Sequence, residues 1–498
     1  MKKAIIVRQE NLTQLSSVAK VPVYDRAKIK AGIVHIGIGG FHRAHQAFYC
    51  DQLLHQNESV DWGICGVALL ERDDKIYQTL KRQDGLYTLI VKELDGTWNP
   101  RIIGSLVEYL FAPEDSQAVI AKIADSDTKI VSLTITEGGY NIDEATGEFN
   151  LKNPLIQHDL SKPENPKTVF GYLTQALKIR KEQDLKGITI QSCDNVQGNG
   201  KVMKKTLLAF VNAAQPDLLD WIENYVSFPD SMVDRITPVT IQDDILRLQK
   251  DFGIDDAWPV VCEPFIQWVI EDDFAVSRPQ WEKVGAQFVK DVTPFEKMKL
   301  SLLNAGHSVL GILGALIGYD TIDQAVQDSD LNIFLRSFMD YEVTPVLNDL
   351  EGVDLTQYKD SLLQRFANIN IKDQVARICS ESSSKIPIFI LPTVTKQLQQ
   401  KGSFNRAAFV IAAWAIYSLG KDEKGNALEV IDTMKAEVNA KALASQKEPK
   451  LFLEMKQVFG NLSESEPFVE SFTDAYINIT NKGIKQCVRE INTSTIGK

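Results

Sequence analysis

Short runs rich in β-branched residues alternate with amphipathic stretches between residues 32 and 215 of this chain. Strands and helices in this order favour a mostly parallel sheet covered by helices. The runs are almost continuously apolar, as strands buried on both faces are. The expected strands are 32–37, 63–69, 86–91, 101–110, 129–136 and 187–193, and the expected helices are 41–54, 113–124, 167–181 and 201–214.

A second kind of pattern begins near Asp291. From about residue 293 to the end, strand-like runs become rare and segments with helical periodicity dominate. A chain of 498 residues exceeds the length at which a single core keeps growing. We therefore expect an α/β dinucleotide-type domain over 1–291 and a mainly α-helical domain over 292–498.

The charge and hydropathy of the chain argue against several classes of protein. Lys and Arg total 54 and Asp and Glu total 66, so the formal net charge is −12. A nucleic-acid partner needs a basic face, which this balance does not favour. No run reaches the roughly 18 to 20 apolar residues of a membrane span, and the N-terminal apolar stretch is too short for a signal peptide. We therefore expect a cytoplasmic protein with neither a nucleic-acid nor a membrane partner.

The six cysteines are scattered, form no CxxC pair and lie at positions 50, 65, 193, 262, 379 and 487. The sequence also lacks an HExxH motif. A zinc site needs three or four closely organised ligands, and a disulfide framework is rare in a large chain without a secretion signal. These features predict reduced cysteines and no metal.

A glycine-rich turn follows the first expected strand, in the segment GIVHIGIGGFHRAHQA. Gly37, Gly39 and Gly40 permit a positive φ and a close approach of the backbone to a ligand. A helix that starts near Phe41 presents free N–H groups to a pyrophosphate, and Arg43 adds a positive charge. The third glycine of the GxGxxG fingerprint is absent, so a purely structural turn is the alternative. Because the turn lies between a strand and a helix, we favour a dinucleotide site.

Two carboxylates follow the next expected strand, in the segment GVALLERDD. A carboxylate at this strand end usually bonds to the adenosine ribose and repels the 2′-phosphate of NADP. Glu71 and Asp73 are the candidates, and they predict NAD as the cofactor. Arg72 lies between them and weakens the prediction, and a solvated charged turn is the alternative.

The helical region opens with a clear helix start, in the segment TPFEKMKLSLLNAGH. Thr293, Pro294 and Glu296 form a capping box with proline at the first helical position. Glu296 serves only as the cap, passes a proton to water, or opposes a loss of charge on a lysine one turn later. The residues leave these three roles open.

Three polar residues follow on the same helix. At 100° per residue, Lys299, Asn304 and His307 share one arc of an otherwise apolar helix. Burial lowers the pKa of a lysine from its usual value of about 10.4 toward a value suited to proton uptake near neutral pH. Each residue alone fits a structural role, but together they predict a site. Three glycines fall on that arc and indicate that a backbone or a ligand packs closely there, at positions 311, 314 and 318.

Several longer motifs are similar to those of one enzyme family. They are GIVHIGIGGFHRAHQA, VSLTITEGGY, SCDNVQGNG, SMVDRITP, EPFIQWVIEDDF and a Lys-x4-Asn-x2-His pattern, in order between about residues 20 and 490. They resemble the polyol-specific long-chain dehydrogenases, the mannitol dehydrogenase family. The resemblance implies a zinc-independent, NAD-dependent, monomeric enzyme that oxidises a polyol to a ketose. It also implies a Rossmann-type domain, a mainly helical domain and an active site between them.

The resemblance assigns roles to four residues. Lys299 is the general acid/base, Asn195 and Asn304 hold the substrate oxygen, and His307 orients the substrate. Asn195 follows an expected strand, where open α/β sheets bind ligands. By itself, it is equally compatible with a turn residue.

The resemblance also bears on the substrate. Arg377 and Lys385 match positions that contact sugar hydroxyls in the mannitol branch of the family, and the hexuronate branch replaces the arginine. We therefore expect D-mannitol and D-fructose as substrates. An Arg and Lys pair also suits a carboxylate, so fructuronate reductase is an alternative, and a non-catalytic sugar- or nucleotide-binding regulator is another. Asp234 and Glu137 occupy motif positions and contact the substrate, relay protons, or form a salt bridge or cap.

Overall fold

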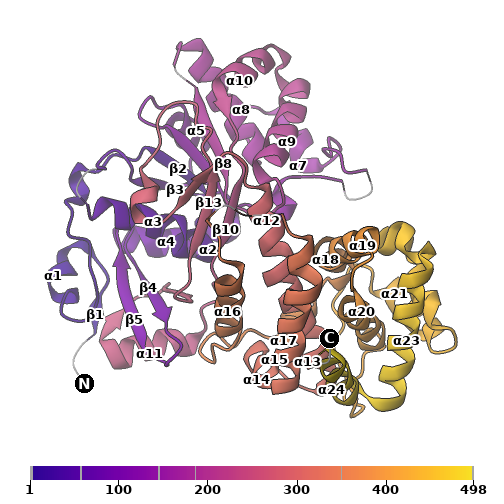
Figure 1. Cartoon of the computed structure of the whole chain (residues 1–498). Helices are drawn as coiled ribbons and strands as arrows, with labels where there is room; N and C mark the ends of the chain where they lie inside the picture. The colour runs from indigo at the N-terminus through magenta and orange to yellow at the C-terminus, as the bar shows by residue number, and fades with distance from the viewer. Residues whose placement is uncertain are drawn as a thin grey trace. The chain divides into compact units, whose positions relative to one another are not determined.

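The structure is a computed structural model that describes residues 4–56, 59–143, 146–185, 187–348, 350 and 352–495. The chain forms two compact units. Unit 1 comprises Met1–Glu93 and Thr97–Thr293, and unit 2 comprises Leu94–Gly96 and Pro294–Lys498. In Figure 1, unit 1 contains the labelled strands, and unit 2 contains most of the orange and yellow helices.

A parallel sheet is the centre of unit 1. Its strands are β2 (Ile33–Ile36), β3 (Ile64–Ala68), β6 (Leu106–Phe111), β7 (Ile130–Leu133), β8 (Ile188–Ser192) and β9 (Val226–Ser227). They lie in the order β6-β3-β2-β7-β8-β9, and neighbouring strands are parallel. This is the strand order 3-2-1-4-5-6 of the Rossmann fold, with its switch point between β2 and β7.

Smaller sheets complete the β-structure of unit 1. Their strands are β1 (Ile5–Ile6), β4 (Tyr87–Lys92), β5 (Trp98–Ile103), β10 (Ser231–Asp234), β11 (Ile254–Asp255), β12 (Val260–Cys262), β13 (Gln267–Glu271) and β14 (Gln287–Val289). The orders are β12-β4-β5, β10-β13-β14 and β1-β11.

Two expected strands differ from the observed ones. The run 86–91 forms β4, which belongs to a small sheet and not to the parallel one. The run 101–110 is divided between β5 and β6, because Gly104 and Ser105 belong to neither strand and the chain passes there from the small sheet to the parallel one. Apolar periodicity identifies a strand but not its partners, which come from distant parts of the chain.

Helices cover both faces of the parallel sheet. The helices of unit 1 are α1 (Leu12–Leu15), α2 (Gly40–Ala44), α3 (Gln46–Leu54), α4 (Asp74–Arg82), α5 (Ser116–Ala124), α6 (Thr136–Gly139), α7 (Pro154–Ser161), α8 (Val169–Glu182), α9 (Asn199–Ala214), α10 (Leu219–Tyr225) and α11 (Gln242–Phe252). Side chains of α5, α8 and α9 form one core cluster with strand residues that include Val34 and Val131. Side chains of α3 and α4 form another with their strand neighbours Ile33 and Ile130. Successive strand residues point to opposite faces, so both faces are apolar.

Unit 2 is mainly helical. Its helices are α12 (Thr293–Lys299), which starts at the last residue of unit 1, α13 (Ala305–Ile317), α14 (Ile322–Gln327), α15 (Ser329–Phe338), α16 (Leu355–Phe366), α17 (Val375–Cys379), α18 (Ser382–Phe389), α19 (Leu391–Gln400), α20 (Asn405–Tyr417), α21 (Lys435–Ser445), α22 (Lys456–Phe459), α23 (Glu466–Lys482) and α24 (Ile484–Thr495). The α13 and α20 helices pack against each other and are buried along nearly their whole length. The predicted fold class, a Rossmann-type parallel sheet followed by a mainly helical part, is confirmed.

One helical stretch within the described residues, Thr293–Ile317, is long and apolar enough to span a membrane by length and composition. Of its most apolar window, 78% is buried inside the protein. Its apolar character is that of a core helix, because α13 packs against α14, α17 and α20.

Candidate functional site

A pocket of about 430 Å³ lies at the switch point of the parallel sheet, beyond the carboxyl ends of β2, β3 and β7. Open α/β sheets bind their ligands in this position. The turn after β2 supplies Gly37, Gly39 and Gly40, and the turns after β3 and β7 supply other residues of the wall. A larger hollow of about 1070 Å³ includes Lys129, Gly187 and Val226, which lie at the amino ends of strands. Because of its location, the smaller pocket is the candidate cofactor site.

Gly37 is required by the fold itself. Its φ is +101°, and a Cβ at this position would lie 2.1 Å from the carbonyl oxygen of Thr134. At Gly39 a Cβ would meet no protein atom within 4 Å, and at Gly40 only Thr237, at 3.8 Å. The packing of the protein therefore does not demand glycine at these two positions, and the backbone there is open to a ligand.

The helix after the turn is shorter than expected. The predicted helix 41–54 is divided into α2 and α3. The division lies at His45, where the backbone leaves the helical conformation, with φ −118° and ψ −91°. Phe41 stacks on the His45 ring and is not among the residues that line the pocket.

Arg43 lines the pocket but is not a mobile surface charge. It is 2% exposed, and its Nη1 donates a hydrogen bond to the Trp258 carbonyl at 2.6 Å. Its guanidinium lies 5.3 Å from the centre of the Tyr87 ring. Burial lowers the pKa of Arg43 to about 10, so it stays charged at neutral pH. Arg43 thus places a fixed positive charge at the pocket and also supports its wall at Trp258.

The structure separates the two candidate carboxylates. Asp73 lines the pocket, and its Oδ2 accepts a hydrogen bond from the Leu70 amide at 3.1 Å. Glu71 is exposed and is not among the lining residues. Arg72 lines the pocket too, so this wall carries charges of both signs.

The turns after β7 and β8 are joined by Asp194, a residue that sequence reasoning did not select. Its carboxylate accepts hydrogen bonds from the amides of Ile135 and Thr136 and from the Tyr140 hydroxyl. Burial raises the pKa of Asp194, and these hydrogen bonds oppose the shift. Asn195 follows directly and is exposed, at the carboxyl end of β8.

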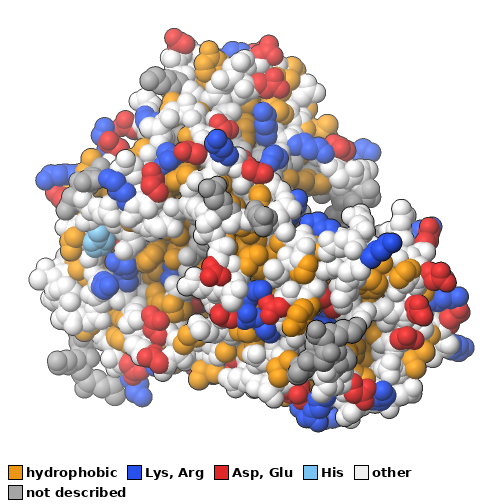
Figure 2. All heavy atoms as spheres, viewed as in Figure 1, with side chains coloured by type: hydrophobic (Ala, Val, Ile, Leu, Met, Phe, Trp, Pro, Cys, Tyr) orange, Lys and Arg blue, Asp and Glu red, His pale blue; other side chains and the backbone are white. Residues whose placement is uncertain are grey.

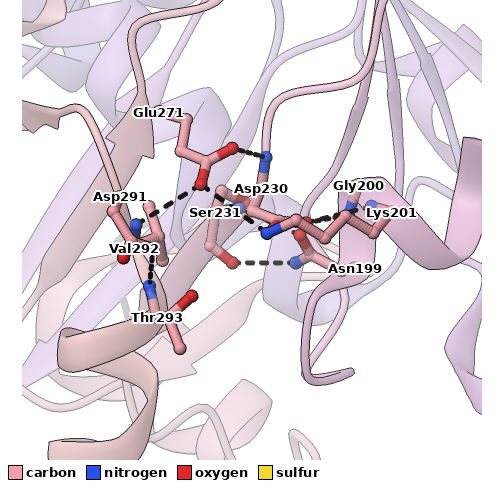
Figure 3. A network of polar contacts seen from close by, with 9 residues as sticks. All are labelled: Asn199, Gly200, Lys201, Asp230, Ser231, Glu271, Asp291, Val292 and Thr293. Atoms are coloured by element: carbon pink, nitrogen blue, oxygen red, sulfur yellow. Dashed lines mark hydrogen bonds and ion pairs between the residues drawn. The ribbon is translucent and has the colours of Figure 1, made fainter.

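Glu137 lies in α6 and is exposed. Asp234 is 4% exposed at the end of β10, where its backbone pairs with Gln267. The other end of β10 belongs to a polar network (Figure 3), in which Glu271 accepts hydrogen bonds from the amides of Asp230 and Val292. This network supports the segment that leads into α12.

The helix that carries the three polar candidates changes its winding. Leu300–Asn304 form a π-helical turn between α12 and α13, so the uniform 100° per residue assumed from the sequence was wrong there. Single π-turns inside helices occur frequently at functional sites. Lys299 is 7% exposed, and Asn304 and His307 are half-buried. Asn304 Oδ1 is buried and accepts no hydrogen bond from the described residues.

Glu296 is 7% exposed, one turn before Lys299. It is in the first turn of α12, where the capping box placed it. Which of its three roles it performs remains a prediction.

The glycines of this helix have structural explanations within unit 2. A Cβ at Gly311 would lie 2.7 Å from Ile378 Cγ2, and one at Gly314 would lie 3.0 Å from Ala325. Gly318 ends α13 with a φ of +96°. Close helix packing and a helix terminus therefore account for these glycines, and they do not indicate a ligand.

In unit 2, Asp373 contacts two of the predicted side chains, those of His307 and Arg377. Asp373 Oδ2 lies 3.9 Å from His307 Nε2, and the Asp373 carboxylate accepts hydrogen bonds from Arg377 Nε and Nη2 at 2.6 to 2.8 Å. Lys385 Nζ donates to the Ile378 carbonyl at 3.0 Å. Burial, and then the nearby Arg377, lower the pKa of Lys385. Asp373 was not predicted, because only the fold places it beside His307.

In the described part of the chain, no group of three or more His, Cys, Asp or Glu residues is arranged to hold a metal ion. The six cysteines are all buried as free thiols.

Known protein families and known proteins are similar to nearly the whole chain. The mannitol dehydrogenase Rossmann domain matches residues 31–283, and the mannitol dehydrogenase C-terminal domain matches residues 291–480. The mannitol 2-dehydrogenase of Aspergillus fumigatus is 45% identical over 96% of this chain and 97% of its own length. That of Pyricularia oryzae is 45% identical over 93% of this chain and 94% of its own length.

Two solved structures are similar over their full length. The ternary complex of Pseudomonas fluorescens mannitol 2-dehydrogenase with NAD and D-mannitol is 44% identical, with a TM-score of 0.86, and the match covers 98% of this chain and 99% of that one. A D-sorbitol dehydrogenase in substrate-free form is 39% identical, with a TM-score of 0.92, over 97% of this chain and 100% of that one. The family resemblance found in the motifs is confirmed.

Proposed function

This chain belongs to the mannitol dehydrogenase family, and on that premise we propose that it is an NAD-dependent mannitol 2-dehydrogenase, which interconverts D-mannitol and D-fructose. The observation that carries the proposal is the 44% identity, over 98% of this chain, to an enzyme solved with NAD and D-mannitol. The sequence similarity extends over both units of this chain and is not limited to the nucleotide-binding fold.

The pocket in unit 1 fits the dinucleotide. Its open backbone at Gly39 and Gly40 suits the pyrophosphate, and the buried Arg43 adds a charge of the right sign. We propose that Asp73, which lines this pocket, bonds to the adenosine ribose and repels a 2′-phosphate. We therefore assign NAD, not NADP, as the cofactor.

The bound nicotinamide supplies a hydride acceptor, and the chain supplies the rest. In oxidation, Lys299 in its neutral form takes the proton of the C2 hydroxyl as the C2–H bond gives up its hydride and the C2 carbonyl forms. Asn195 and Asn304 donate hydrogen bonds to the oxygen while it carries negative charge, an arrangement often worth about 2.7 to 4 kcal/mol per donor. His307 orients the substrate, and its ring lies near Asp373 and packs at a tilt against the Phe366 ring.

The charge around Arg377 favours a neutral polyol over a uronate. Arg377 is the side chain that would bind the carboxylate of a uronate. However, two nitrogens of its guanidinium already donate hydrogen bonds to the Asp373 carboxylate. A second carboxylate there would meet the negative charge of Asp373. Lys385 already donates a hydrogen bond to the Ile378 carbonyl, and its amine has further donors that hydroxyl groups can accept.

The D-sorbitol dehydrogenase supports a second candidate substrate. D-Sorbitol differs from D-mannitol only in configuration at C2, and oxidation at C2 converts both to D-fructose. Only the arrangement of groups around C2 distinguishes them, so both belong in the substrate test.

We also propose that the enzyme is a cytoplasmic monomer. All six cysteines are free and buried, as is usual in a reducing compartment.

A substrate panel tests the proposal. Rates are measured with D-fructose and D-fructuronate for NADH and NADPH, and with D-mannitol and D-sorbitol for NAD. We expect D-fructose with NADH and D-mannitol with NAD to be fastest. A faster rate with D-fructuronate would replace the proposal with fructuronate reductase, and no turnover of any substrate would favour a non-catalytic binding protein.

A further inference from the structure

We propose that Asp194 is a positioning residue for the cofactor: its carboxylate holds the turn after β7 in the shape that forms one wall of the 430 Å³ pocket. The inference rests on the proposed function, because it takes this pocket as the NAD site. Asp194 touches neither the substrate nor the cofactor in the mechanism above and acts through the turn.

The carboxylate is completely engaged in the turn. It accepts hydrogen bonds from the amide of Ile135 at 3.1 Å, from the amide of Thr136 at 2.8 Å and from the Tyr140 hydroxyl at 2.8 Å. Asp194 is 7% exposed, so these bonds are shielded from water. Hydrogen bonds to a buried carboxylate are stronger than bonds to a neutral acceptor.

The turn needs such support because Thr136 adopts a left-handed conformation, with φ +62°. A β-branched residue rarely adopts this conformation, and it persists only where the surroundings hold it. The amide of Thr136 is one of the donors to Asp194. The carboxylate thus stabilises the residue whose backbone is least stable by itself.

The same turn is part of the pocket. Ile135 and Thr136 line it, together with Gly138 and Gly139 from the short helix that follows. The turn after β7 lies at the switch point of the sheet, where a dinucleotide crosses between the two halves of the Rossmann fold. A wall that is already in its bound shape lowers the cost of binding.

The backbone of Asp194 is fixed from the other side. Asn199 Nδ2 donates hydrogen bonds to the Asp194 carbonyl at 3.0 Å and to the Ser231 carbonyl at 2.8 Å. Ser231 in turn donates its amide to Asn199 Oδ1 at 2.9 Å, and Figure 3 shows these two residues side by side. Asp194 therefore connects the cofactor wall to the end of β8, directly before Asn195.

The test compares NADH affinity and thermal stability in the full-length wild type and in Asp194→Asn. NADH binding is measured by its fluorescence and by quenching of tryptophan, since Trp258 lines the pocket. The amide of asparagine has nearly the same shape but cannot accept all three hydrogen bonds. We expect the Kd for NADH to rise roughly tenfold.

Asp230→Asn is the matched control. Asp230 is also a buried carboxylate, 2% exposed, that accepts hydrogen bonds from two successive amides, those of Gly200 and Lys201 (Figure 3). It does not line the 430 Å³ pocket. We expect a similar loss of thermal stability in both variants, but a Kd for NADH within about twofold of the wild type in Asp230→Asn.

Two further variants separate positioning from folding. Tyr140→Phe removes one donor and leaves the carboxylate, so we expect the Kd for NADH to rise about two- to threefold. Adding Thr136→Gly to Asp194→Asn removes the strain that the carboxylate compensates, and should recover part of the lost affinity.

Unchanged NADH affinity in Asp194→Asn would overturn the inference, as would an equal loss in Asp230→Asn or no recovery with Thr136→Gly. If Asp194→Asn fails to fold, Tyr140→Phe decides, and an unchanged Kd in that variant overturns the inference. Failure of the proposed function is a separate result: the wild type itself would then bind no NADH or would not oxidise D-mannitol.

Discussion

At the scale of the residue, Lys299 is a buried amine in an apolar helix, directly before a π-helical turn. We predict that Lys299→Ala lowers kcat for D-mannitol by about 10²- to 10⁴-fold, the usual effect of losing a general base. The Kd for NADH should change little, because the proposed cofactor pocket is in unit 1. Steady-state kinetics and NADH fluorescence measure the two quantities.

Lys297→Ala is the control for that variant. Lys297 lies on the same helix but is exposed. It should retain near-normal turnover. Similar activity in both variants would remove the lysine from the mechanism.

Asp73 gives a prediction about cofactor choice. It lines the pocket, and replacement by Asn keeps an acceptor for the Leu70 amide while removing the negative charge. The preference for NAD over NADP, as the ratio of kcat/KM values, should fall roughly tenfold in Asp73→Asn. Glu71→Gln, outside the pocket wall, should leave the ratio unchanged. The reverse pattern would show that Glu71 is the discriminating carboxylate.

At the scale of the element, the sequence predicted regular pieces well and their interruptions poorly. The strand, glycine turn and helix at residues 32–54 were expected from local patterns, but the break at His45 was not. The π-turn at Leu300–Asn304 was missed, because a periodicity analysis assumes constant winding. Such irregularities depend on packing against distant residues, which a local pattern does not contain.

Glu342 shows how a buried charge can determine the stability of an element. It is fully buried and accepts hydrogen bonds from the amides of Arg406 and Ala407 at 2.7 and 2.9 Å, in the first turn of α20. Burial raises the pKa of Glu342 from 4.5 to about 7. The folded protein therefore binds a proton on the Glu342 carboxylate more tightly than the unfolded chain does. Because of this difference, the contribution of Glu342 to the free energy of unfolding falls as the pH rises from about 4.5 to about 7.

We predict that Glu342→Gln removes this part of the pH dependence. Between pH 5 and pH 8, the free energy of unfolding should fall further in the wild type than in the variant, by up to about 3 kcal/mol. Thermal unfolding at both pH values measures the difference. Equal slopes in the two proteins would show that Glu342 titrates normally.

At the scale of the whole molecule, the sequence was most informative where its motifs are long. The order of units and the Rossmann-type sheet were predicted, and the family was identified from six motifs. Asp194 and Asp373 were not selected, because their importance depends on partners far along the chain. Tyr140 is 54 residues from Asp194, and His307 precedes Asp373 by 66 positions. Roles that depend on such pairs need the folded structure.

Hydride transfer from C2 of D-mannitol to NAD is tested most directly by isotope transfer. The substrate is D-mannitol deuterated at C2 and C5, which its twofold symmetry makes equivalent, and mass spectrometry follows the NADH and the D-fructose. We predict NADH with one deuterium, D-fructose that keeps the other, and a slower rate than with unlabelled D-mannitol. NADH without deuterium, or no NADH at all, would contradict direct hydride transfer by this enzyme.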